Sequence, residues 1–543
     1  MPPHLDPRPD ARLCAALAAD LDAADLRSES LRAAWGDDAD DALARGIRSP
    51  LLHAIAHRTD PLATLGRLFV VGLPQPVADV AAALPTVGIE GIEALGLAAR
   101  DGDVVAPAAL IRPQSFVDAD GVGEWWIASD LDEVALGGPL PPDHVLGVGG
   151  ASRTLASLVM PEQVDRALDL GTGCGIQALL VSRHAGHVVA TDISARALAY
   201  AELNARLAGV ENIEFRFGSM FAPVAGESFG LIVSNPPFVI TPRAEGVPAY
   251  EYRDGGLVGD ALVEGFIREA PAHLAPGGAA QLLGNWETRS GVDGLERVRS
   301  WIPDDLDAWV IERERLTPLG YAELWIRDGG TTPRDAGFEP LLEAWLDDFA
   351  ERDVTAVGFG YVLLRRPSGL DLPTTERESS GAGVPRGEPD PEPARTASTV
   401  AERGGEGSDG GGGRLRRFER IEQAVSGVGT ALRQGLRAHD LLAGGIPPRL
   451  VAAPDVTEAR HHLPGQEAPS VIELRQGGGF GRTVAVDPAL AGFVGACDGE
   501  LTVGQIVQAL ADLFEVPLDA LWADMRPRIR DLVVDGFLIP ALT

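Results

Sequence analysis

The sequence contains no lysine, so all 46 of its basic side chains are arginine. Arginine stays protonated and cannot act as an amine nucleophile. This excludes a Schiff-base lysine, a phosphate-binding P-loop lysine and a kinase-type lysine–glutamate pair. The chain is therefore not a pyridoxal-phosphate enzyme, a Walker-type ATPase or a Ser-x-x-Lys hydrolase.

Cysteine and long apolar runs are also scarce. The three cysteines, Cys14, Cys174 and Cys497, are too isolated for a disulfide framework or a zinc site, which indicates a reducing compartment. His53 and His57 have the spacing of a metal pair, but no third ligand accompanies them, so we predict no metal site. Prolines and aspartates interrupt the N-terminus, and Pro74, Pro76 and Asp79 interrupt the apolar stretch at 68–84, far short of the ~20 residues of a membrane span. We expect a cytoplasmic protein without a membrane segment.

Acidic residues outnumber basic ones by 79 to 46, which gives a formal net charge of −33. Nucleic-acid binding depends on neutralising phosphates, so this balance disfavours wholesale binding to DNA or RNA. It favours small, basic or protein partners. A genome-wide composition bias or a salt-adapted surface would produce the same balance.

The 543 residues, 45% of them hydrophobic, are enough for about three or four domains. Residues 367–414 have few large apolar side chains and many Pro, Gly, Ser and Glu, which predicts a disordered linker. Residues 1–150 are mainly helical and end in two short helices and a hairpin turning at Asp101, a winged-helix-like pattern. Residues 415–543 end in three helices and a short strand, which again indicates a winged-helix-like domain.

Residues 151–366 alternate between strands and helices. Short apolar runs lie near 166–171, 187–192, 212–218, 229–235 and 278–286. Helical patterns separate them, and a pair of strands closes the order. Such alternation predicts an α/β fold with a doubly wound, Rossmann-like parallel sheet that is covered on both faces.

A glycine-rich motif, LDLGTGCGIQ, follows the first of these strands. Gly171, Gly173 and Gly175 allow a sharp turn and let a ligand approach without meeting a Cβ atom. The spacing is not that of a dinucleotide fingerprint, and the strand ends in Asp169. A pyrophosphate requires a bare helix N-terminus, whereas an acidic strand end suits a cationic ligand.

Further ligand-binding candidates follow the next two strands. Asp192 lies about 20 positions after the glycines, where an acidic residue can hold two ribose hydroxyls. The next residue, Ile193, would pack on adenine. Ser219 follows the third strand and would reach the adenine edge.

The fourth strand runs into SNPPFVITP. Pro236 and Pro237 fix the backbone and remove two N–H groups, so their carbonyls are acceptors without a competing donor. Asn235 adds an amide oxygen and Phe238 a flat aromatic face. Together these groups suit a planar NH₂ group that donates two hydrogen bonds while stacked on a ring.

With these three motifs in this order, residues 151–366 resemble class I S-adenosylmethionine-dependent methyltransferases that carry an N-P-P-aromatic motif and methylate amino groups on planar centres. The resemblance implies S-adenosyl-L-methionine as cofactor. It assigns the methionine part to the glycine-motif residues, the ribose and adenine to the next two strand ends, and the target nitrogen to the N-P-P-F residues. In sequence order these are Asp169, Gly171, Thr172, Gly173 and Gly175; Asp192, Ile193 and Ser219; and Asn235, Pro236, Pro237 and Phe238.

Two branches of this group fit the sequence, and both act on macromolecules. The Asp-Gly-Gly segment at 254–256 and the NPPFVITP form resemble HemK-type release-factor glutamine methyltransferases. Phe238 in place of the tyrosine usual there is similar to the branch that methylates guanine or adenine amines in RNA. The acidic balance favours a protein substrate, because the arginines available to RNA are dispersed. These are Arg243, Arg253, Arg289 and the cluster at 414–420.

Two further features extend beyond the methyltransferase motifs. The C-terminal segment is weakly similar to PqqD-type modules, which share its Cys-Asp-Gly step at Cys497 and its Gly-Phe-Leu strand at Gly536. A non-catalytic, cofactor-binding scaffold whose two winged-helix-like ends recruit partners is the alternative to an enzyme.

Overall fold

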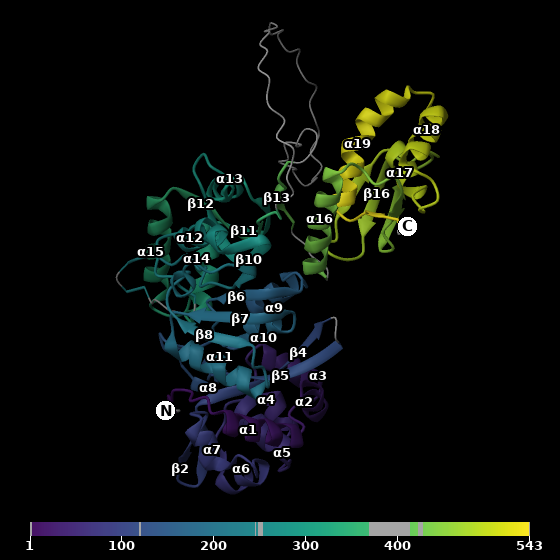
Figure 1. The fold of residues 1–543 in the computed structure, drawn as a ribbon. Helices are drawn as coiled ribbons and strands as arrows, with labels where there is room; N and C mark the ends of the chain where they lie inside the picture. Colours follow the sequence, from purple (N-terminus) through teal and green to yellow (C-terminus); the bar gives the residue numbers. More distant parts are fainter. Residues whose placement is uncertain are drawn as a thin grey trace.

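The structure is a computed structural model that describes residues 3–118, 121–138, 140–244, 246–247, 253–368, 413–421 and 427–541. Figure 1 shows an N-terminal part in purple and blue, a central sheet with its helices in teal, and a C-terminal module in green and yellow. The linker predicted at 367–414 lies outside the described residues except at its two ends. Within the described ranges, no helix is long and apolar enough to cross a membrane.

The N-terminal part begins with short helices and ends in two β-hairpins. Its elements are α1 (Ala11–Ala23), α2 (Ser28–Trp35), α3 (Asp37–Ala44), α4 (Ser49–Ala54), α5 (Pro61–Leu65), a π-helical turn (Gly66–Val70), β1 (Gln75–Pro76), α6 (Val77–Ala83), α7 (Gly88–Ala94), β2 (Ala98–Asp101), β3 (Val104–Pro107), β4 (Ala109–Asp118), β5 (Gly121–Asp130) and α8 (Glu133–Leu136). The predicted helix pair and hairpin are present as α6, α7 and β2–β3, with Asp101 paired to Val104 across the turn. The longer hairpin β4–β5 was not predicted.

The central sheet has eight strands among the described residues, in the order β13-β11-β12-β10-β9-β6-β7-β8. They are β6 (Val164–Leu170), β7 (Ala185–Asp192), β8 (Ile213–Phe217), β9 (Phe229–Ser234), β10 (Leu274–Arg289), β11 (Asp307–Leu316), β12 (Val354–Arg365) and β13 (Arg416–Arg420). Strands β8, β7, β6, β9 and β10 are mutually parallel, and β12 runs antiparallel between β10 and β11. The predicted doubly wound sheet and its closing pair of strands are confirmed.

Helices cover both faces of this sheet, as expected for buried parallel strands. They are α9 (Gly150–Leu158), α10 (Ile176–Ser182), α11 (Ala195–Leu207), α12 (Ala261–Glu269), α13 (Gly294–Trp301), α14 (Pro318–Asp328) and α15 (Phe338–Glu351), with 3₁₀ turns at Ala222–Val224 and Ala270–His273. Helices α12 and α13 pack on one face through side chains such as Phe266 and Val298, and α9 packs on the other through Leu155 and Leu158. Helices α14 and α15 form a separate cluster against β12 and the segment that follows β9.

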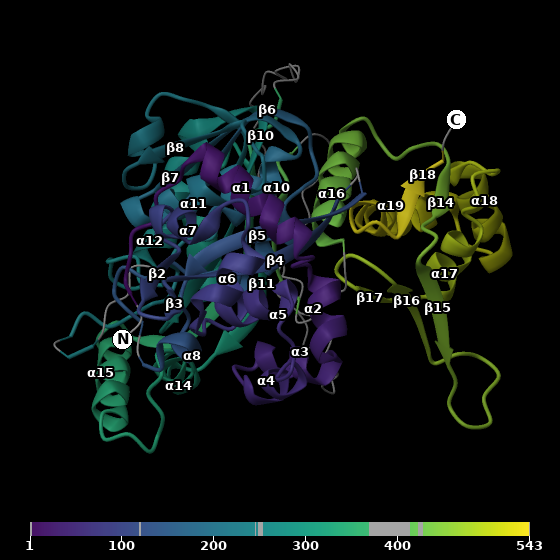
Figure 2. The same ribbon diagram turned by 90° about the horizontal axis from the view of Figure 1, so that it is seen from below.

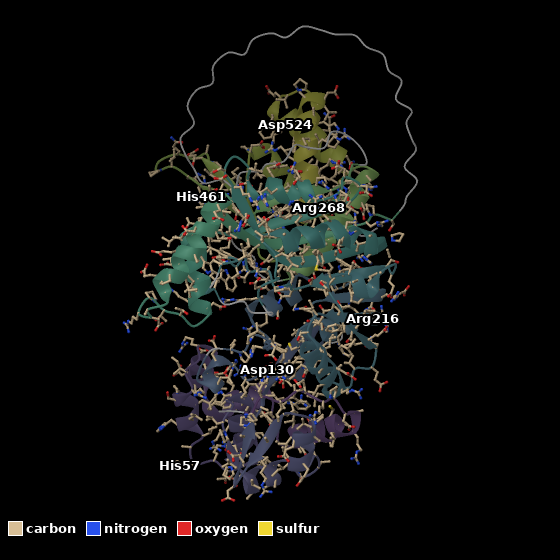
Figure 3. All side chains as sticks on the ribbon, turned by 90° about the vertical axis from the view of Figure 1, so that its left-hand side faces the viewer. His57, Asp130, Arg216, Arg268, His461 and Asp524 are labelled. Atoms are coloured by element: carbon tan, nitrogen blue, oxygen red, sulfur yellow. The ribbon has the colours of Figure 1, made fainter. Side chains whose placement is uncertain are left out.

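A buried ion pair joins the N-terminal part to the central sheet domain. Asp130, at the end of β5, accepts from Arg196 of α11 through two bonds of 2.5 and 3.0 Å. The Tyr200 hydroxyl and the Val145 N–H also donate to this carboxylate, at 2.8 and 2.9 Å. Figure 3 labels Asp130 between the two groups of elements. Because both charged side chains are only 6% exposed, this pairing fixes how the N-terminal part docks.

Asn204 of α11 connects the N-terminal part to the glycine-rich loop. Its amide exchanges two hydrogen bonds with the backbone of Ala128 in β5, at 2.7 and 2.9 Å. The same Nδ2 donates to the carbonyl of Cys174 at 2.8 Å. One buried side chain therefore ties β5, α11 and the glycine-rich loop together.

The C-terminal part also contributes to the central sheet. Strand β13 pairs in parallel with β11, from Ala308 opposite Arg416 to Glu312 opposite Arg420. Helix α16 (Val428–Ala443) then lies beside the sheet in both ribbon views (Figures 1 and 2). The domain boundary predicted at residue 415 therefore does not separate the two domains, because β13 and α16 belong to the packing of the sheet.

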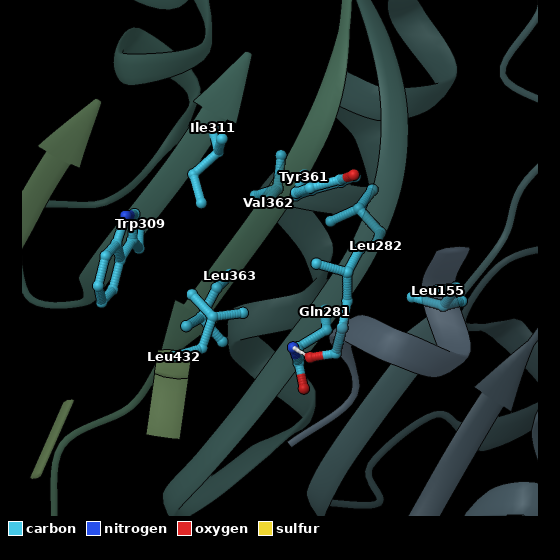
Figure 4. A pocket seen from close by; sticks show the side chains of 10 residues that line it. Leu155, Gln281, Leu282, Trp309, Ile311, Tyr361, Val362, Leu363 and Leu432 are labelled. Atoms are coloured by element: carbon cyan, nitrogen blue, oxygen red, sulfur yellow. Dashed lines mark hydrogen bonds between the residues drawn. The ribbon is translucent and has the colours of Figure 1, made fainter. Parts of the chain in front are cut away.

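The contact between α16 and the sheet is apolar. Leu432 packs with Trp309, Leu363 and Leu155 around a small cavity, shown in Figure 4. At Gly435 a Cβ atom would lie 2.5 Å from the Trp309 ring, so glycine is required for this close approach.

Beyond α16 the chain folds into a mixed module. Its elements are β14 (Leu450–Ala452), β15 (Val456–His461), β16 (Val471–Gln476), β17 (Thr483–Val486), α17 (Pro488–Gly495), α18 (Val503–Phe514), α19 (Leu518–Val534) and β18 (Leu538–Pro540). The three helices and the last strand were predicted, whereas the antiparallel sheet β15-β16-β17 before them was not. Figure 2 shows this module to one side of the central sheet.

Candidate active site

The ligand-binding candidates gather at the carboxyl ends of the parallel strands. Strand order reverses between β6, which leads through α10 to β7, and β9 on its other side. Ligands of doubly wound sheets bind at such a switch point. The glycine motif follows β6, Asp192 ends β7, Ser219 follows β8 and the N-P-P-F segment follows β9.

The glycine-rich loop turns through three residues with positive φ, Gly171 at 76°, Gly173 at 55° and Gly175 at 85°. A Cβ atom at Gly175 would lie 2.9 Å from the Cβ of Ala201, so this glycine allows the loop to approach α11. A Cβ atom at Gly171 or Gly173 would meet nothing within 4 Å. The open side of the loop therefore presents bare backbone to a ligand.

Asp169 is buried beneath this loop. Its Oδ2 accepts from the Thr172 hydroxyl at 2.6 Å and from the Ala178 N–H at 2.9 Å. Its Oδ1 is buried and has no hydrogen-bond partner within the described part of the chain. Burial raises the pKa of Asp169 to about 7, and the nearby charge of Asp192 adds to this effect. A cationic group would offset the free-energy cost of burying the carboxylate charge and would bind to its remaining acceptor.

Asp192 and its neighbours lie at the carboxyl end of the adjacent strand, β7. The carboxylate accepts from the N–H groups of Gly173 and Ser194, at 2.9 and 2.8 Å, which fixes its direction. Burial raises its pKa as well. Ile193 is 62% exposed, so its apolar side chain is available to a flat ring. The Ser219 side chain is exposed just beyond β8.

The N-P-P-F segment presents acceptors beside an aromatic ring. Ser234, the last residue of β9, donates from its hydroxyl to the Leu170 carbonyl at 2.8 Å and so ties the ends of β9 and β6 together. The Asn235 Oδ1 is buried, and no donor among the described residues reaches it. The ring of Phe238 lies 5.4 Å from that of Phe359, centroid to centroid. A buried acceptor without a donor is costly unless a ligand supplies one.

A second loop packs against this segment. The Val239 N–H donates to the Arg253 carbonyl at 3.0 Å, and Phe238 forms a β-bridge with Asp254. Asp254 in turn accepts from Arg243 at 2.8 Å. A small pocket lies between Phe238 and the loop that contains Leu257.

Two further polar residues contact this region but were not predicted. Tyr321 of α14 and Asn285 of β10 lie beneath the residues that follow Phe238. They are 36 residues apart, and neither is part of a recognisable motif, so only the folded chain brings them together.

The arrangement fits S-adenosylmethionine. Asp169 offers a cation a buried acceptor that no described residue uses, and the open sides of Gly171 and Gly173 leave room for the methionine part. The fixed carboxylate of Asp192 and the exposed side chain of Ile193 have the chemistry that a ribose and an adenine require.

Comparison with known proteins agrees with this geometry. Residues 147–292 match the family described as "Methyltransferase small domain". The chain is 32% identical over 282 residues to the release factor glutamine methyltransferase of Xylella fastidiosa, covering 98% of that protein and 45% of this chain. The chain belongs to the release factor glutamine methyltransferase family. As a member of this family, it is an S-adenosylmethionine-dependent methyltransferase.

Other proteins are similar to this methyltransferase over shorter lengths. The ribosomal protein uL3 glutamine methyltransferase of Bradyrhizobium diazoefficiens is 35% identical over 151 residues, which is 26% of this chain and 46% of that protein. A solved structure of ribosomal protein L11 methylase from Lactobacillus delbrueckii is 19% identical, covers 42% of this chain and 84% of that chain, and has a TM-score of 0.22. Residues 23–108 match a separate family described only as a domain of unknown function (DUF7059).

Proposed function

We propose that this methyltransferase acts on the side-chain amide nitrogen of a glutamine in a protein of the translation machinery, in the cytoplasm. The observation that carries the proposal is the Asn235 Oδ1, a buried acceptor without a donor in the described structure, next to Pro236 and the Phe238 ring. An amide NH₂ group provides two donors in one plane, which is the complement of this site. The relatives named for release factors and for ribosomal protein uL3 support a glutamine in a protein substrate.

The chemistry follows from the electronic structure of the amide. Its nitrogen lone pair is delocalised, so it is a poor nucleophile unless it is held in line with the methyl group. S-adenosylmethionine, when bound, supplies an electrophilic methyl on a sulfonium. Asn235 and the Pro236 carbonyl would accept the two N–H bonds, orient the nitrogen and stabilise the positive charge that develops on it. The methylated nitrogen is acidic enough to lose its proton without a strong general base.

Most of the arginines that RNA would require are already paired with carboxylates of the same chain. Arg243 contacts Asp254 and Arg289 contacts Glu287, both at 2.8 Å. Three further candidates, Arg253, Arg417 and Arg420, pair with Asp328, Asp535 and Asp293. Arg416 lies 3.9 Å from the exposed Asp304. Binding of phosphates would have to break these pairs, so the charge distribution supports a protein over an RNA substrate.

Transfer of a labelled methyl group from S-adenosylmethionine tests the proposal. Purified release factor, ribosomal protein uL3 and ribosomal RNA are offered separately to the full-length enzyme, and the labelled residue is located by mass spectrometry. We expect label on a glutamine of one of the two proteins and none on RNA. Label confined to RNA, or to a protein residue other than glutamine, would refute the proposal.

Substitution of Asn235 tests the role of the acceptor. Asn235→Ala should lower kcat at least 100-fold, because an acceptor that acts in the transition state is lost, while cofactor affinity stays within a few-fold. Asn212→Ala is the matched control, since that amide binds the Ser182 and Ala185 carbonyls at the opposite edge of the sheet. Equal activity of the two variants would contradict the assignment.

A further inference from the structure

The segment after the N-P-P-F motif has few backbone anchors. Pro236 and Pro237 lack N–H groups, so neither can donate a hydrogen bond that holds the loop. The first donors after Phe238 are the N–H groups of Val239 and Ile240. Val239 donates to the Arg253 carbonyl at 3.0 Å, and Ile240 donates to the Tyr321 hydroxyl at 3.1 Å. These two bonds anchor the backbone directly after the motif, where Val239 and Ile240 are also buried against α14 and α15, and one of the bonds ends on a side chain.

Tyr321 is held rigidly on α14. Thr317 caps this helix by accepting from the Gly320 N–H at 3.1 Å, and Pro318 occupies its first turn. The Tyr321 side chain is buried, and its ring lies 6.0 Å from Trp345 and 5.9 Å from Phe349, centroid to centroid. This aromatic cluster leaves the hydroxyl little freedom.

Asn285 fixes the hydroxyl from the sheet side. Its Nδ2 donates to the Tyr321 Oη at 2.5 Å, and its side chain is also buried. Asn285 lies near the carboxyl end of β10, the strand beside β9, which leads into Asn235. The hydroxyl thus links α14, the sheet and the loop. Burial also raises the Tyr321 pKa, which keeps the group neutral.

We propose that Tyr321 and Asn285 are positioning residues for methyl transfer. They hold the backbone of 238–240 so that the Asn235 and Pro236 acceptors and the Phe238 ring keep the geometry that the target amide requires. The inference rests on the proposed function in one respect, the role of Asn235 to Phe238 in holding the target nitrogen. A shift of about 1 Å at a reacting centre lowers turnover by up to ~10²-fold.

Two tyrosine-to-phenylalanine variants separate positioning from a general loss of stability. Tyr321→Phe removes the acceptor of the Ile240 N–H and keeps the ring. Tyr361→Phe is the matched control. Tyr361 is a buried residue of β12, and its hydroxyl accepts from Arg313 of β11 at 2.9 Å. We expect kcat to fall about 10- to 100-fold in Tyr321→Phe with little change in KM or cofactor affinity, and to stay near the wild-type value in Tyr361→Phe.

Amide hydrogen exchange of the full-length protein gives a readout that needs no substrate. In Tyr321→Phe the amides of 238–241 should exchange faster, whereas Tyr361→Phe should leave them unchanged. Unchanged exchange there in Tyr321→Phe would overturn the inference, as would a kcat equal to that of Tyr361→Phe. If the wild-type enzyme methylates neither protein substrate, the proposed function fails, while faster exchange in Tyr321→Phe still supports the anchoring of the loop.

Discussion

Cofactor affinity should depend on pH through Asp169. Burial raises the pKa of this carboxyl to about 7, so in the cofactor-free protein it is largely protonated at pH 5.5. The site needs the carboxylate for a cationic ligand, and binding of the cation would therefore expel the proton. By linkage, affinity for S-adenosylmethionine rises as pH increases towards 7.

The magnitude follows from the fraction of Asp169 that is ionised before binding. With a pKa of about 7, that fraction is about 0.03 at pH 5.5 and about 0.5 at pH 7.0. The dissociation constant should therefore fall about 15-fold over this range. The range ends below the pKa of a free α-amino group, so the charge of the ligand stays nearly constant.

Isothermal titration calorimetry at several pH values in buffers of different ionisation enthalpy measures both the affinity and the protons released. Asp169→Asn should bind more weakly at pH 7.0 and lose most of the pH dependence. Asp192→Asn measures the part of the pH dependence that comes from the second carboxyl, because burial raises the pKa of Asp192 too. A wild-type profile that is flat, or one that survives unchanged in Asp169→Asn, would refute the reasoning.

The same raised pKa gives a second, ligand-free readout. Between pH 4 and 7 the folded state binds more protons at Asp169 than the unfolded state, whose carboxyl has its ordinary value of 3.8. The free energy of unfolding contributed by this group therefore decreases as pH rises, by up to about 4 kcal/mol. Asp169→Asn should remove that part of the pH dependence from chemical denaturation.

Two further predictions concern the flanking parts. Asp130→Asn should lower the free energy of unfolding by up to about 3–5 kcal/mol, because it removes the buried carboxylate partner of Arg196 and leaves only the exposed Asp6 as an ionic partner. Protection of the β5 amides from hydrogen exchange should fall with it, and protection equal to wild type would contradict the docking role. Leu432→Ala should lower the free energy of unfolding by about 2–5 kcal/mol, because it opens a cavity beside Trp309. The control Leu513→Ala changes a side chain that is 72% exposed and should alter stability by less than about 0.5 kcal/mol. Similar midpoints of thermal unfolding for the two variants would show that α16 is not part of the sheet packing.

Features that depend on near neighbours in the chain were predicted from the sequence. The alternation of strands and helices gave the sheet, because each run carries its own apolar period. The glycine motif and the N-P-P-F segment marked the site, because the backbone restrictions of Gly and Pro are local properties. Both motifs follow parallel strands of one sheet, so their meeting at one edge could be expected without coordinates.

Features that depend on distant parts of the chain were decided only by the tertiary structure. Strand β13 joins the sheet beside β11 more than a hundred residues away, and the sequence placed its residues in a separate domain. Asn204 supports the carbonyl of Cys174 only because β5 and α11 pack together. Tyr321 and Ile240 meet across 81 residues.

The protonation and the hydrogen bonding of the site residues also depend on the tertiary structure. Residue types alone do not reveal the raised pKa of Asp169, or that no described residue donates to the Asn235 acceptor. Both follow from how the surrounding chain packs. The sequence by itself thus determined the reaction class and predicted where the candidate site lies. The tertiary structure determined how the site is held and charged, because desolvation and long-range hydrogen bonds exist only once distant segments are packed together.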